Sequence, residues 1–223
     1  MIHKKTLLSV VSRLMVVVLG ISITSCLTFE ESYVFKKNGS GSMKYLIDMS
    51  EIASLMKLNA ESDSSGDSES LSFQDVADLL SGMDGISKVK VLDDEDKGFY
   101  GVSFDFAGIT PLNQALNVLM GDEENEDFTF FSFDGNVITH NHLLATDALP
   151  PGMDDPETEE QVSGFLQQMK YKLNFSFASP VKVVYSGAES EITGKKDKAV
   201  SIETNFRTLL EDASTLNSSI VLK

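Results

Sequence analysis

The sequence of 223 residues has no tryptophan and a single cysteine, Cys26. One cysteine excludes an internal disulfide. The sequence also has no Gly-x-Ser-x-Gly nucleophile elbow, no His-Glu-x-x-His zinc helix, no phosphate loop and no dinucleotide fingerprint. We therefore expect a protein that is not an enzyme and needs no cofactor. Its 14 phenylalanines and nine methionines predict a soft, adaptable apolar interior.

Basic residues are scarce, with 18 lysines and arginines against 34 acidic residues and a net charge of −16. Lys4, Lys5 and Arg13 lie in the first 25 positions, which hold no acidic residue, so the chain from Cys26 onward carries a charge of −19. Such a surface makes nucleic acid a poor partner. It also repels anionic lipid headgroups, so we do not expect a basic patch to hold the protein at a membrane.

The N-terminal segment has the parts of an export signal. The basic start His3-Lys4-Lys5 precedes an apolar run from Leu14 to Ile23. That run is about half of the ~20 apolar residues that span a bilayer, so a transmembrane anchor is disfavoured. The residues Ile23-Thr24-Ser25-Cys26 resemble the bacterial lipobox, whose cysteine is acylated and becomes the new N-terminus.

This resemblance implies a signal peptide over 1–25 and diacylglycerol on Cys26. A short tether over 26–28 follows, and with 42% hydrophobic residues the rest of the chain is long enough for one domain over 29–223. Two or more acyl chains hold a protein stably at a bilayer. We therefore expect a membrane-anchored lipoprotein on the extracytoplasmic side of the cell envelope. Leu27 stands where an aspartate resembles an inner-membrane retention signal in enterobacteria, which favours the outer membrane. The alternative is a buried core cysteine near an uncleaved start.

Hydrophobic periodicity predicts an α+β fold, with a largely antiparallel sheet of consecutive hairpins and helices between them. The turn pairs Asn38-Gly39 and Asp134-Gly135 indicate two of the hairpins, and the Ser- and acid-rich stretch 59–70 indicates a solvated loop. Strands are expected at 29–37, 41–49, 88–92, 99–107, 128–133, 136–143, 171–177, 181–185, 190–193, 199–203 and 219–222. Helices are expected at 51–58, 72–83, 110–121, 157–170 and 206–213.

Two histidines, His140 and His142, lie two residues apart in a predicted strand, so their imidazoles project from one face. Such a pair can share a metal ion, but no cysteine or third histidine lies nearby in the sequence. We therefore predict no metal site and an exposed polar face on this strand.

Acidic runs at 93–96, 122–127 and 154–160 raise the alternative of calcium binding. An EF-hand loop starting at Asp93 would place Lys97 at its fifth position and Phe104 at its twelfth, where acceptor oxygens are required. The acidic runs are therefore predicted to be solvated turns.

The most informative apolar segment runs from 128 to 133. Strand alternation places Phe128 and Phe130 on one face and Phe131 and Phe133 on the other. An antiparallel sheet covered on one side has a face toward water, so something must cover the second aromatic face. The alternatives are ordinary core packing by the sheet or the loop 144–157, a protein partner, or an apolar ligand bound at these four phenylalanines.

Three stretches, 34–41, 128–142 and 177–184, resemble the LppM-like group of bacterial lipoproteins. They are an early strand with a glycine turn, the aromatic hairpin, and a strand, proline and valine-rich strand in succession. The resemblance implies an envelope-facing α+β domain that binds a lipid or glycolipid in an apolar cavity, with no catalytic residues. We therefore predict a non-enzymatic lipoprotein that binds a lipid or other apolar ligand. The alternative is a lipoprotein that docks a protein partner.

Overall fold

The computed structural model describes residues 27–50, 73–94, 96–120, 127–143 and 163–223. No helix among these residues is long and apolar enough to cross a membrane. Several predicted features lie outside the described residues: the signal 1–25, Cys26, the helix 51–58, the loop 59–70, the loop 144–157, the acidic run 154–160 and most of the acidic run 122–127.

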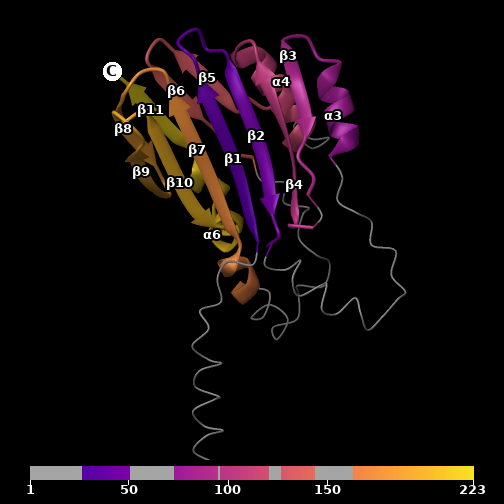
Figure 1. Cartoon of the computed structure of the whole chain (residues 1–223). Coiled ribbons are helices and arrows are strands. Elements are labelled where there is room, and N and C mark those ends of the chain that lie inside the picture. Colours follow the sequence, from indigo (N-terminus) through magenta and orange to yellow (C-terminus); the bar gives the residue numbers. More distant parts are fainter. Residues whose placement is uncertain (1–26, 51–72, 95, 121–126, 144–162) are drawn as a thin grey trace, which may run out of the picture.

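Two β-sheets form the framework, which confirms the α+β prediction (Figure 1). The larger sheet has seven strands in the order β3 (Ile86–Val91), β4 (Phe99–Phe106), β2 (Gly41–Asp48), β1 (Thr28–Phe35), β7 (Lys170–Phe177), β10 (Ala199–Asn205) and β9 (Glu189–Thr193). The smaller sheet has four strands in the order β5 (Phe131–Asp134), β6 (Val137–His140), β11 (Ser218–Leu222) and β8 (Val181–Ser186).

Both glycine-containing hairpin turns are confirmed. Gly39 joins β1 to β2 with a φ of 77°, and Gly135 joins β5 to β6 with a φ of 64°. These left-handed values cost glycine little because it has no Cβ. The other neighbouring strands of the described residues pair antiparallel, whereas β1 and β7 are parallel, with Phe35 opposite Phe177. This register places two aromatic side chains at the same end of the larger sheet.

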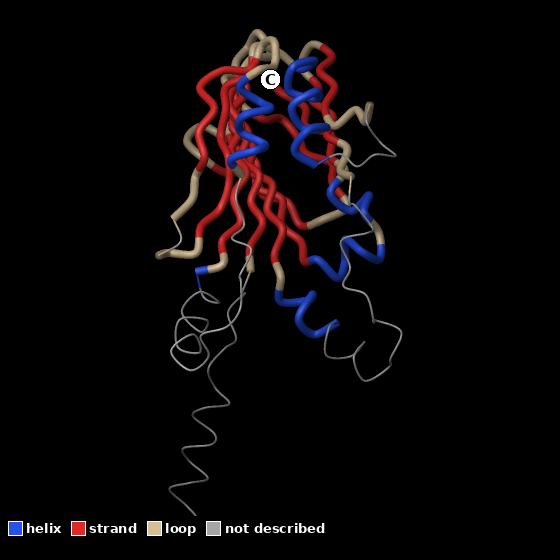
Figure 2. Tube along the Cα trace, turned by 90° about the vertical axis from the view of Figure 1, so that its right-hand side faces the viewer, coloured by secondary structure: helices blue, strands red, loops and turns tan. Residues whose placement is uncertain are grey.

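The two faces of the larger sheet differ in polarity, as the alternation along β1 shows. Glu31, Tyr33 and Phe35 point inward and are buried, whereas Glu30 and Val34 point outward. The smaller sheet covers part of the inner face, because the ring of Tyr33 lies 4.8 Å from that of Phe131, centroid to centroid. The helices α3 (Gln74–Ser81) and α4 (Ile109–Met120) add further cover, and Figure 2 shows them beside the strands.

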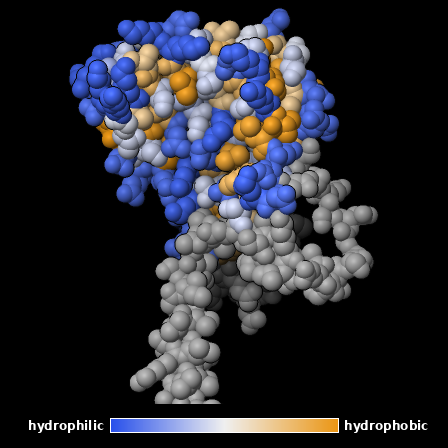
Figure 3. All heavy atoms as spheres, viewed as in Figure 1, coloured by the Kyte–Doolittle hydropathy of each residue, from blue (hydrophilic) through white to orange (hydrophobic). Residues whose placement is uncertain are grey.

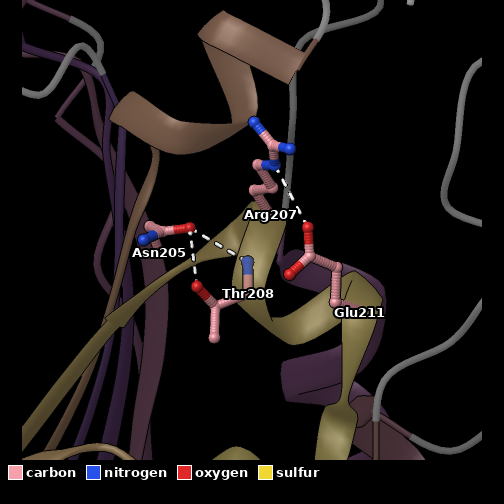
Figure 4. A network of polar contacts seen from close by, with 4 residues as sticks. All are labelled: Asn205, Arg207, Thr208 and Glu211. Atoms are coloured by element: carbon pink, nitrogen blue, oxygen red, sulfur yellow. Dashed lines mark hydrogen bonds and ion pairs between the residues drawn. The ribbon is translucent and has the colours of Figure 1, made fainter.

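The lower end of the interior, as drawn in Figure 1, is closed by α6 (Phe206–Glu211), which is followed by the 3-10 helix η2 (Ala213–Leu216). The side chain of Asn205 caps α6 by accepting hydrogen bonds from the backbone N–H and the hydroxyl of Thr208, as Figure 4 shows. The Phe206 ring packs on Phe29 at 4.7 Å and on Tyr171 at 5.7 Å. The same close-up shows the ion pair between Arg207 and Glu211, one helical turn apart.

Candidate functional site

A pocket of about 240 Å³ lies at the opposite end of the two sheets, where the hairpin tips meet. The larger sheet contributes Phe35 and Phe177, whose rings stack at 5.9 Å with an interplanar angle of 11°. The smaller sheet contributes Phe133 and Ile138, which are partners in the β5–β6 register. Leu222 completes these apolar walls. The pocket is therefore formed by segments far apart in the sequence.

The rim of the pocket is held by backbone hydrogen bonds between these segments. The N–H of Leu222 donates to the carbonyl of Asn136 at 2.8 Å, and that of Lys223 donates to Pro180 at 2.8 Å. The N–H of Ala178 donates to the carbonyl of Phe35 at 3.1 Å. Three exposed lysines, Lys36, Lys37 and Lys223, also line the pocket, so an apolar interior opens through a basic rim.

The four phenylalanines of the segment 128–133 have different environments. Phe133 is half-buried and lines the pocket. Phe130 and Phe131 are each 1% exposed and belong to the packed core. Phe128 is half-buried, and its ring meets that of Phe130 edge-on at 4.8 Å. The structure therefore places only Phe133 of these four at the pocket.

Two asparagines of α4 hold the start of this segment. The Asn113 amide accepts from the N–H of Phe131 at 2.8 Å and donates to its carbonyl at 2.9 Å. Asn117 makes the same two contacts with Phe128, at 3.1 and 2.9 Å. These amides satisfy the backbone of the segment before and at the start of β5, and the predicted strand begins three residues before β5 and ends one residue before its end.

A buried carboxyl group lies deeper between the sheets. Glu31 has no exposed surface, and the hydroxyls of Tyr33 and Tyr171 donate to its two oxygens. Burial raises the pKa of Glu31 above its usual value, although the two hydrogen bonds oppose that effect. Burial and the neighbouring Glu31 raise the pKa of both tyrosines, so their hydroxyls remain donors at neutral pH.

The predicted exposed polar face at His140 and His142 is wrong. Their side chains are 1% and 7% exposed, because this side of β6 and the residues after it faces the larger sheet. The His142 ring packs edge-on against Tyr171 at 4.9 Å. Within the described part of the chain, the Nε2 atoms of both histidines have no hydrogen-bond partner, and no metal-binding group of three or more ligands is found.

Burial keeps both histidines neutral. It lowers the pKa of His140 to about 3, with a contribution from His142, and that of His142 to about 4. In the unfolded chain both histidines have pKa values near 6.5. At a pH between about 4 and 6.5, the unfolded chain therefore binds up to two more protons at these sites than the folded chain does. Glu31 acts in the opposite direction, because its raised pKa keeps a proton on the folded chain that the unfolded chain has released.

Two histidines favour proton binding by the unfolded chain, and Glu31 alone opposes them. The free energy of unfolding is therefore expected to fall as the pH is lowered from 7 toward 4. His142→Leu removes one proton-binding site of the unfolded chain and should flatten this dependence. Urea unfolding at a series of pH values, followed by circular dichroism, measures it. A pH dependence of the variant equal to that of the wild type would show that His142 titrates normally in the folded protein.

The structure thus defines a two-sheet α+β domain with an apolar pocket at one end. No family model and no curated protein matches the sequence. Among solved structures, the chain is similar to the folded domain of the LppM protein of Mycobacterium tuberculosis, determined by NMR. The two are 12% identical, 91% of this chain and 94% of that one are covered, and the TM-score is 0.44.

Proposed function

We propose that this chain is a membrane-anchored, non-enzymatic lipoprotein of the cell envelope that binds the apolar part of a lipid or other amphiphile in the pocket. The observation that supports this proposal is the composition of the pocket, in which Phe35, Phe133 and Phe177 form walls behind a rim of lysines. Apolar walls with a few polar groups at the opening are typical of ligand sites. An anionic headgroup fits the lysine rim.

The volume of the pocket limits what it holds. Pockets that bury most of a drug-sized ligand have volumes of roughly 300–1,000 Å³. At about 240 Å³, this pocket accommodates a portion of such a ligand. The end of one acyl chain matches the apolar walls, and the rest of the amphiphile then lies outside, at the lysines. The proposed ligand class is therefore a single-chain amphiphile, or one chain of a larger lipid.

The pocket lies at the opposite end of β1 from the residues that follow the proposed anchor, Cys26. β1 begins at Thr28, two residues after Cys26, and ends at Phe35 in the pocket wall. Its eight residues span roughly 25 Å at about 3.3 Å per residue. An anchored chain therefore opens its pocket away from the membrane that holds it, which is the outer membrane if Leu27 has the sorting role read from the sequence.

The pocket is tested by titrating the chain from Leu27 onward with a fluorescent fatty acid. Phe133→Ala removes part of one wall, and the lost apolar contact should weaken binding about tenfold, which corresponds to roughly 1.4 kcal/mol. Phe128→Ala is the matched control, since it removes a half-buried phenylalanine of the same segment that does not line the pocket. The control should bind within about twofold of the wild type.

Circular dichroism of both variants verifies that the fold is retained. Equal weakening by Phe128→Ala and Phe133→Ala would place the ligand elsewhere. If the wild type does not bind the fatty acid, the proposal that the pocket holds a single-chain amphiphile is wrong.

A further inference from the structure

Positive charge is concentrated at the pocket end of the molecule. Hydrogen bonds join the turns there: the N–H of Val181 donates to the carbonyl of Asp197 at 2.7 Å, and that of Phe177 donates to Lys198 at 2.8 Å. Figure 3 shows hydrophilic side chains over this upper end. Seven lysines lie on these turns and the adjoining strand ends, and we name them the lysine cluster: Lys36, Lys37, Lys182, Lys195, Lys196, Lys198 and Lys223.

The lysine cluster differs from other basic residues of the chain in its partners. Elsewhere, Lys44, Lys172 and Arg207, for example, form ion pairs with glutamates. Among the described residues, no lysine of the cluster forms an ion pair, and Lys198 donates to a backbone carbonyl instead. Two exposed carboxylates, Asp134 and Asp197, lie on the same turns. This end therefore has a local excess of positive charge in a strongly acidic chain.

We propose that the lysine cluster docks the pocket end of this protein on an anionic phospholipid membrane. A bilayer presents negative headgroups over hydrocarbon, and this surface presents lysines around the mouth of an apolar pocket. Polybasic surfaces are attracted to such membranes by about 1 kcal/mol per lysine, or roughly fivefold in affinity. A bilayer therefore matches both features of this end, the charge and the apolar opening.

The overall negative charge does not prevent this docking. At physiological ionic strength the Debye length is about 8 Å, so charges farther away are largely screened. The ends of β1 lie roughly 25 Å apart, so carboxylates near its start contribute little at the cluster. A membrane at the pocket end is therefore exposed to the local positive charge of the lysine cluster and not to the total charge of −19. In a chain anchored at Cys26, the docked membrane faces the one that holds the anchor.

Vesicle co-sedimentation tests the proposal. Both sheets and their core lie within the described residues from Leu27 onward, so the anchor-free chain starting there is used. It should bind vesicles of phosphatidylcholine and phosphatidylglycerol, and not vesicles of phosphatidylcholine alone. Lys195→Glu, outside the pocket, should weaken binding at least roughly fivefold, and the double variant Lys182→Glu/Lys195→Glu roughly 25-fold.

The matched control is Lys90→Glu, the same change of charge at an exposed position on the edge strand β3. It should bind within about twofold of the wild type. Equal losses from Lys90→Glu and Lys195→Glu, or no binding to anionic vesicles by the wild type, would overturn the proposal. So would binding of soluble polyphosphate without binding of vesicles. Lys195→Glu should lose vesicle binding and keep fatty-acid binding, because Lys195 does not line the pocket, which separates this proposal from that of the pocket ligand.

Discussion

Glu31→Ala is expected to lower the free energy of unfolding by about 3–5 kcal/mol. The substitution leaves the buried hydroxyls of Tyr33 and Tyr171 without their acceptor, which costs about 1–3 kcal/mol for each group. It also removes a side chain with no exposed surface and leaves a cavity between the sheets. For a domain of this size, the melting temperature should fall by on the order of 10 °C.

Urea unfolding of the chain from Leu27 onward, followed by circular dichroism, measures this effect. Glu30→Ala is the matched control on the same strand, where the side chain faces outward and pairs with Lys44 at 3.0 Å. A partly exposed ion pair contributes less than about 1 kcal/mol, so the control should change stability little. Glu31→Gln keeps the shape and one acceptor oxygen, and it should lie between the two. Equal stability of Glu31→Ala and Glu30→Ala would contradict the role assigned to the buried carboxyl.

Cys26→Ser should abolish membrane anchoring, because the thiol is the atom that a lipid transferase modifies. Labelled palmitate fed to cells should be incorporated into the wild type and not into the variant. The wild type should partition into the detergent phase, and the variant should accumulate as unprocessed precursor or as released protein. Cys26 precedes β1 (Thr28–Phe35) in the sequence, so we expect the variant domain to unfold at the wild-type temperature.

Equal labelling of the two proteins would show that Cys26 is not the acylated residue. A wild-type protein found in the cytoplasm with Met1 intact would contradict the whole lipoprotein assignment. Ser25→Ala is a useful control, because it changes the residue before the cysteine and keeps the thiol. It should be labelled and processed like the wild type.

Local sequence signals predicted much of the fold, because turns and alternation are local properties. Asn38-Gly39 and Asp134-Gly135 mark hairpins that the structure contains, since glycine adopts positive φ at little cost. The parallel pairing of β1 with β7 was not predicted, because it joins strands more than a hundred residues apart. That pairing brings Phe35 beside Phe177, and it is what forms one wall of the pocket.

The burial of several polar residues could not be predicted from the sequence. The alternation that includes His140 and His142 is the pattern of a strand with an exposed polar face. However, β6 belongs to a second sheet, and the side of it that carries these histidines packs against the first sheet. Glu31 gave no signal either, because its partners Tyr33 and Tyr171 come from two strands. The lysine cluster was hidden in the total charge, since it assembles from separate turns.

Photo-crosslinking shows whether an acyl chain enters the pocket between the hairpin tips. A fatty acid with a diazirine near its methyl end is bound to the wild-type chain, irradiated, and the modified peptides are mapped by mass spectrometry. Modification is expected at the pocket walls, around Phe133, Ile138 and Phe177, and it should be lost when unlabelled fatty acid competes. Competed modification on α3 and α4, with the pocket walls unlabelled, would contradict this expectation.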